Sequence, residues 1–138
     1  YYSLRHYLLR HPTFKKKLKA YLVLAEDAQR IFDDHYYDDL ISFEEDIARI
    51  ASLIAIIAES PGSLSELGSF SSIELIAKRT CAIQQREYET ERSFITLGPI
   101  KRLSETHKGS VAYYPWKRNK TRYFTRLAAL TLSQSRDI

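Results

Sequence analysis

The stretch Leu53–Phe70, "LIAIIAESPGSLSELGSF", decides the fold. Residues 53–58 are apolar at every position, which is typical of a parallel strand that is buried on both faces. A Glu-Ser-Pro-Gly turn follows, and a helical spacing of apolar residues begins directly after it. A strand, a short loop and a helix in this order are the unit from which parallel α/β sheets are built.

The rest of the chain repeats this alternation. We expect helices, or short helical turns, at 1–11, 26–34, 41–53, 63–79, 93–103 and 121–132, the second last broken at Gly98-Pro99. We expect further strands at 18–25, 80–85 and 110–114. The helix at 41–53 would start with a capping box of Ser42 and Glu45. The pattern predicts a flavodoxin- or Rossmann-like α/β fold, with a parallel sheet and helices on both faces.

In such a fold, ligands bind beyond the carboxyl ends of the strands. The turn Glu59–Gly62 therefore lies at the expected binding edge. Folds of this class normally open on a strand, whereas this chain opens on a helix, and it contains no methionine. We therefore expect residues 1–138 to be one domain of a longer protein, with the first strand and its loop upstream of residue 1.

Composition narrows the class of protein. Of the 138 residues, 44% are hydrophobic, an ordinary fraction for a globular domain. No apolar run approaches the roughly 20 residues of a membrane span, so we expect no membrane partner. The single Cys81 excludes an intramolecular disulfide and fits a reducing compartment, which favours the cytoplasm. Histidines and Cys81 lack the spacing of a metal site, so no metal is predicted.

Charge is distributed unevenly. Residues 1–25 carry six basic groups and no acid, whereas 26–66 carry eleven acids against two arginines. Near the C-terminus, aromatic residues mix with basic ones, the latter being Lys117, Arg118, Lys120 and Arg122. Aromatic rings can stack on bases while cations meet phosphates, so this segment is a candidate nucleic-acid interface. The alternative is a packed element whose cations are merely solvated.

Glu66 is the first candidate for chemistry. Ser63 is a plausible N-cap, and Glu66 follows three residues later, so the pair could simply be a capping box. A carboxylate in the first helical turn is also held ionised by the backbone dipole. Placed at the mouth of a cleft, it could attack an anomeric carbon or stabilise an oxocarbenium ion. Both interpretations stay open at this point.

The neighbouring residues support the same hypothesis. Glu59 could orient a base or protonate a leaving group, or it could be a solvated loop acid. Gly62 would let the backbone turn tightly and approach a ligand. Ser93 precedes the "FITLGPI" segment and could close over the ligand or serve as a surface cap.

A resemblance sharpens these expectations. The stretch "LISFEEDIARIASLIAIIAESPGSLSELGSFSSIELIAKRTCAIQQ", followed by "RSFITLGPIKRL", resembles the N-terminal domain of the nucleoside deoxyribosyltransferase-like effectors of bacterial retron defence systems. The ordered match covers about 20–113. Its specific features are a helix capped by acids, an apolar strand, E-S-P-G-S-x-x-E-L-G-x-F, and S-F-I-x-x-G-P-I.

The resemblance implies roles for individual residues. The glutamate of the E-L-G segment is the superfamily's nucleophile and corresponds to Glu66. The acid before that helix corresponds to Glu59, with the spacing different by one, and the acid that starts the preceding helix corresponds to Glu44. The "AEDAQRIFDD" loop, with Ala25 where proline is usual, contributes Glu26 and Asp27. The substrate-binding set is then Glu26, Asp27, Glu44, Ser60, Gly62, Ser63 and Ser93.

The resemblance also implies an activity and partners. We expect a toxin that cleaves the N-glycosidic bond of a nucleotide, with NAD as one candidate substrate and no separate cofactor. A reverse transcriptase and its multicopy single-stranded DNA, covalently joined to RNA, would hold it silent within a larger oligomeric complex. A helical region would follow Ile138. The alternative is a nucleotide- or nucleic-acid-binding module that has kept the fold without the chemistry.

Overall fold

The computed structural model describes residues 3–17, 22–32 and 37–115. Its sheet has three parallel strands in the order β1 (Ile54–Ile57), β2 (Thr80–Gln85) and β3 (Val111–Tyr114). Ala55 pairs with Cys81, and Ile83 pairs with Ala112. The prediction of a parallel α/β sheet is therefore confirmed.

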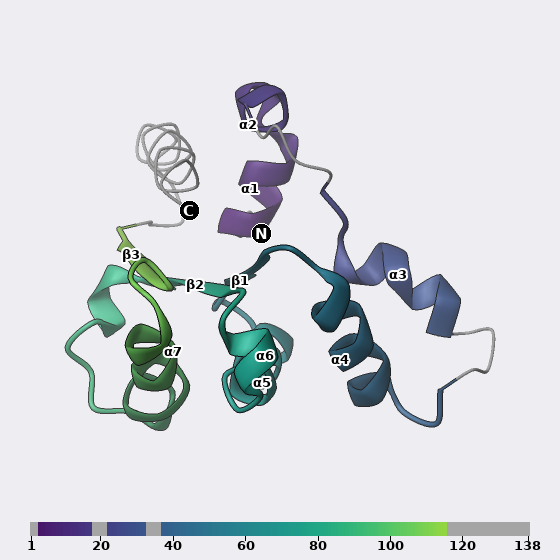
Figure 1. The fold of residues 1–138 in the computed structure, drawn as a ribbon. Coiled ribbons are helices and arrows are strands. Elements are labelled where there is room, and N and C mark those ends of the chain that lie inside the picture. Colours follow the sequence, from purple (N-terminus) through teal and green to yellow (C-terminus); the bar gives the residue numbers. More distant parts are fainter. Residues whose placement is uncertain (1–2, 18–21, 33–36, 116–138) are drawn as a thin grey trace.

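Helices cover both faces of this sheet (Figure 1). One face carries α1 (Leu4–Arg10) and α2 (Pro12–Lys17), and the other carries α5 (Pro61–Phe70), α6 (Glu74–Ala77) and α7 (Lys101–Thr106). The helices α3 (Ala25–Phe32) and α4 (Leu40–Ile50) lie beyond the edge of β1 (Figure 1). Two short segments, η1 (Arg86–Tyr88) and η2 (Thr96–Ile100), lie between β2 and α7.

Two hydrophobic clusters explain why the strands are apolar on both faces. On the face of α1, Leu4, Leu8, Phe14, Ile83 and Tyr114 pack together. On the opposite face, the cluster includes Ile56, Leu67, Ile76, Ala82 and Leu103. Neighbouring residues of β2, Ala82 and Ile83, thus belong to different clusters, as the alternation of side chains along a strand requires.

The strand expected at 18–25 is not found where the structure describes this segment. Residues 18–21 lie outside the described residues, Leu22 to Leu24 have no regular structure, and Ala25 already begins α3. A strand exists only by pairing, and within the described sheet the edge of β1 opposite β2 has no partner. For the same reason β1 is an edge strand of this sheet and not the central one that its sequence suggested.

The helix expected at 63–79 is two helices. The Ser71 and Ser72 hydroxyls both donate to the Gly68 carbonyl, at 3.0 and 2.9 Å. These side-chain bonds take up an acceptor at the end of α5, and α6 starts only at Glu74.

Two other local predictions were wrong. No break occurs at Gly98-Pro99, because the helix continues from Phe94 through the π-helical η2 into α7 with Pro99 inside it. The wider π turn accommodates a residue that lacks the N–H group. The N-cap of α4 is Asp39 and not Ser42, since the Asp39 carboxylate accepts from the Ser42 backbone N–H at 2.8 Å. The helix expected at 121–132 lies outside the described residues.

Candidate functional site

The start of α5 is built from a reciprocal pair of serines. Ser60 is the N-cap, and its hydroxyl accepts from the Ser63 backbone N–H at 3.2 Å. The Ser63 hydroxyl accepts in return from the backbone N–H groups of Ser60 and Glu59, at 3.1 and 3.2 Å. The capping box therefore begins three residues earlier than predicted, and Ser63 is not the N-cap.

This shift moves Glu66 out of the first helical turn into the second. The first turn of α5 holds no acid, so the expectation that the helix dipole keeps Glu66 ionised was wrong. Glu66 is half-buried, and burial raises its pKa. The nearby carboxylates of Glu44 and, more weakly, Glu26 also raise this pKa, whereas the positive charge of Arg5 lowers it.

Glu66 thus belongs to a group of three acids that comes from three helices. We call Glu26 on α3, Glu44 on α4 and Glu66 on α5 the carboxylate cluster. Burial also raises the pKa of Glu44. The sequence singled out all three residues, although they are up to forty positions apart, and the structure brings Glu26 and Glu44 within electrostatic reach of Glu66.

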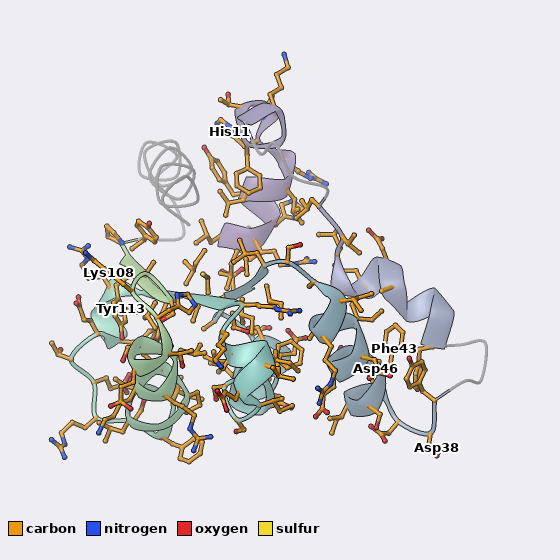
Figure 2. The ribbon with its side chains drawn as sticks, in the orientation of Figure 1. His11, Asp38, Phe43, Asp46, Lys108 and Tyr113 are labelled. Carbon is orange, nitrogen blue, oxygen red and sulfur yellow. The ribbon has the colours of Figure 1, made fainter. Side chains whose placement is uncertain are left out.

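Packing between α3 and α4 helps to hold the cluster. Phe43 of α4 is almost fully buried and points toward α3 (Figure 2). Its ring lies 5.9 Å from that of Phe32 and 5.2 Å from that of Tyr37. The Tyr37 hydroxyl donates to the Asp46 carboxylate at 3.1 Å, which ties the segment before α4 to the helix itself. Glu44 therefore stands on a fixed helix next to the one that carries Glu26.

Arg5 of α1 supplies the positive charge of this region. Its guanidinium donates to the Glu26 carboxylate at 2.5 Å, and both side chains are about half exposed. The pKa of Glu26 is lowered, first by a hydrogen bond from its own backbone N–H and then by Arg5. Sequence analysis missed Arg5. The only signal was that the N-terminal residues carry basic groups and no acid.

Glu59 contacts α1 directly. Its carboxylate accepts from the backbone N–H groups of Leu4 and Arg5, at 2.9 and 3.1 Å. The Ser3 hydroxyl accepts from the next N–H, that of His6, at 3.0 Å. Glu59 is thus the second cap of α1, and it is neither a solvated loop acid nor an α5 residue.

Gly62 lies in the first turn of α5, so it does not form the tight turn that we expected. Among the described glycines only Gly109 has a positive φ, of 87°. A Cβ at Gly62 would meet only the Ser60 hydroxyl, at 4.0 Å. The backbone therefore does not require glycine at this position.

The other predicted site residues differ in how the structure places them. Asp27 is exposed on α3. The Ser93 hydroxyl accepts from the Thr96 backbone N–H at 3.3 Å, which makes it a cap of the helix that starts at Phe94. The basic residues lie outside the described part of the chain, namely Lys117, Arg118, Lys120 and Arg122.

Two further properties concern the described residues as a whole. Across 3–17, 22–32 and 37–115, no three His, Cys, Asp or Glu side chains are grouped so that they could hold a metal ion. Within the same ranges, every helix is too short or too polar to cross a bilayer.

Comparison with known proteins gives two relatives from Escherichia coli. The chain is 30% identical over 110 residues to the "Retron Ec86 putative ribosyltransferase/DNA-binding protein", and the match covers 73% of this chain and 36% of that protein. It is 31% identical over 80 residues to the "Retron Ec73 putative ribosyltransferase/DNA-binding protein", and this match covers 58% of this chain and 25% of that protein. The chain therefore spans well under half the length of these relatives.

A family model gives a match over almost the whole chain. The model is described as STM3845 retron effector protein, and it matches residues 1–136. The chain accordingly belongs to the STM3845 retron effector family.

Proposed function

We propose that this domain carries the catalytic centre of a retron effector that cleaves the N-glycosidic bond of a nucleotide, with Glu66 as the nucleophile. The observation that carries the proposal is the carboxylate cluster: Glu26, Glu44 and Glu66 come from separate helices, and the charges of Glu44 and Glu26 act on Glu66. The names of the two relatives, which include "ribosyltransferase", support a glycosyl-transfer reaction.

The chemistry proceeds in two balanced steps. The Glu66 carboxylate attacks the anomeric carbon, and the C–N bond breaks with its electron pair leaving on the base. Water then attacks the anomeric carbon of the glycosyl ester and breaks its bond to the Glu66 oxygen. This releases the sugar with its new hydroxyl group, returns Glu66 as a carboxylate and gives one proton to the solvent. A base that leaves as an anion takes up a proton, whereas a pyridinium base such as nicotinamide leaves neutral without one.

Poor solvation suits Glu66 to this role. Burial and the neighbouring carboxylates destabilise its negative charge, and these are the causes that raise its pKa. A carboxylate in such surroundings is stabilised when positive charge develops on the sugar in the transition state. Glu44 is the better candidate proton donor, because its pKa is also raised by burial and it acts directly on Glu66. Ser60, Gly62, Ser63, Asp27 and Ser93 stay predicted substrate-binding residues.

The wider biological role is part of the proposal. We infer that the full-length protein acts in anti-phage defence in the cytoplasm, on a nucleotide pool for which NAD is one candidate. We also infer that the retron reverse transcriptase and its multicopy single-stranded DNA hold it inactive within a larger oligomeric complex. Membership of a retron effector family supports an association with retron components.

The test compares Glu66→Gln with wild type in the full-length protein. The control is Glu105→Gln, which removes an exposed acid on α7 whose distance to the Lys101 ammonium is 4.0 Å. We expect Glu66→Gln to abolish release of free base from nucleotides and depletion of cellular NAD or nucleotide pools, with folding intact. The control variant should behave like wild type. A folded Glu66→Gln protein with full activity would contradict the proposal.

One alternative has support of its own. The names of both relatives also include "DNA-binding", and a basic segment follows Tyr114 in the sequence. A domain that only binds nucleic acid would keep its function in Glu66→Gln and lose it when the basic segment is neutralised.

A further inference from the structure

We propose that Glu59 is a positioning residue that acts through α1: its carboxylate clamps the first turn of this helix to the end of β1 and thereby fixes Arg5 beside the carboxylate cluster. This inference rests on the proposed function, because it assigns the support of the same site. It gives Glu59 a task other than proton donation.

The contacts of Glu59 carry the first step. Its two carboxylate oxygens each accept from one backbone N–H group, those of Leu4 and Arg5, at 2.9 and 3.1 Å. Ala58 directly follows β1, and its backbone N–H donates to the Ile83 carbonyl at 2.9 Å. Glu59 is the next residue. The carboxylate therefore joins a residue held at the sheet to the helix on one face of the sheet. With both oxygens engaged as acceptors, Glu59 is a poor candidate for a proton donor.

The second step leads from the clamp to the cluster. Arg5 is itself one of the two clamped residues, so the bond to Glu59 fixes the backbone from which the guanidinium extends. That guanidinium forms the ion pair with Glu26 at 2.5 Å. Leu4, the other clamped residue, is fully buried in a hydrophobic cluster with Ile83. This packing leaves the first turn of α1 little freedom to move. Release of the clamp would let Arg5 move away from the acids.

The consequence for Glu66 has a definite sign. The charged groups that act on Glu66 are Glu44, Glu26 and Arg5, and Arg5 is the one that lowers its pKa. β1 and η2 also pack against α5, and neither carries a titratable side chain. The helices α4, α6 and α7 share a hydrophobic cluster with Leu67 of α5, and of their charged groups only Glu44 acts on Glu66. Loss of Arg5 from its place should therefore raise the pKa of Glu66. Direct removal of a negative charge near Glu66 would instead lower it, so the direction of the change separates the two mechanisms.

The test is a titration of Glu66 followed by carbon-13 NMR of glutamate carboxyls in the full-length protein, with the Glu66 signal assigned from Glu66→Gln. Glu59→Gln and Arg5→Met should both shift the Glu66 midpoint to higher pH. Combined with Arg5→Met, Glu59→Gln should add no further shift. Ser3→Ala is the control, because it removes the other cap of α1 and leaves the clamp in place, and it should not shift the midpoint.

Other outcomes would overturn the inference. These are an unchanged or lowered midpoint in folded Glu59→Gln, or an equal shift with and without Arg5. Glu59→Asp, which keeps the charge but shortens the reach, gives a second variant should Glu59→Gln not fold, and the same upward shift is expected. The titration uses no substrate, so it can succeed even where Glu66→Gln shows that the proposed activity is wrong. In an active protein, the acid limb of kcat/KM should move to higher pH together with the midpoint.

Discussion

Replacing Glu59 with alanine should weaken the attachment of α1 to the sheet. The change removes both acceptors of the Leu4 and Arg5 backbone N–H groups, which lie in the first turn of the helix. Loss of a helix cap costs about 1 kcal/mol, and hydrogen bonds to charged groups contribute about 1.5–3 kcal/mol each. These bonds are only partly buried, so we expect a loss of about 2 kcal/mol for Glu59→Ala and about 1 kcal/mol for Glu59→Gln, which keeps one acceptor oxygen.

The assay combines thermal unfolding with amide hydrogen exchange. A loss of about 2 kcal/mol should lower Tm by roughly 8 °C for a domain of this size. Exchange at the Leu4 and Arg5 amides should accelerate more than exchange at the amides of β2, because the clamp protects these two groups locally. Glu87→Ala, at an exposed acid of η1, should cost less than about 0.5 kcal/mol. Unchanged exchange at Leu4 and Arg5 would refute the clamp.

Three further predictions concern the candidate site. Gly62→Ala should stabilise α5 by about 0.5–1 kcal/mol, as should the control Gly68→Ala, but only Gly62→Ala should weaken substrate binding in a KM measurement. Burial raises the pKa of Glu44 and Glu66, so their contribution to stability is present below the ordinary glutamate pKa and is lost as pH rises through the raised values. Glu44→Gln should weaken this dependence in pH-dependent unfolding and, because Glu44 is the proposed proton donor, slow cleavage of nucleotides whose base leaves as an anion. The basic segment consists of Lys117, Arg118, Lys120 and Arg122. Neutralising these residues should flatten the salt dependence of nucleic-acid binding, because fewer counterions are released. An unchanged slope would show that the segment does not contact nucleic acid.

The sheet could be predicted because its signal is local. Short runs at 54–57, 80–85 and 111–114 each form a strand, and the spacing between them leaves room for crossover helices. The segment 18–25 is also a short, mainly apolar run, but a strand needs a neighbouring strand in space, and composition does not report one. The helix boundaries were less accurate, because Asp39 and Ser60 competed successfully with the residues that we expected to cap α4 and α5.

The candidate site could be predicted only in part. Glu26, Glu44 and Glu66 were singled out from the sequence, through the turn after the strand and through the family resemblance. The upward shift of the Glu66 pKa could not be predicted, because it depends on burial and on charges from three other helices. The roles of Arg5 and Glu59 could not be predicted either, since their contact joins residues 54 positions apart in the sequence.

The central claim is that Glu66 forms a covalent bond with the sugar. The most direct test is to mix the full-length protein with a nucleotide substrate, quench with acid on a millisecond scale, and map the adduct by peptide mass spectrometry. We predict a glycosyl ester on Glu66 that appears before free sugar accumulates and is absent from Glu66→Gln. An adduct on another residue, or cleavage by Glu66→Gln at the wild-type rate, would contradict the account.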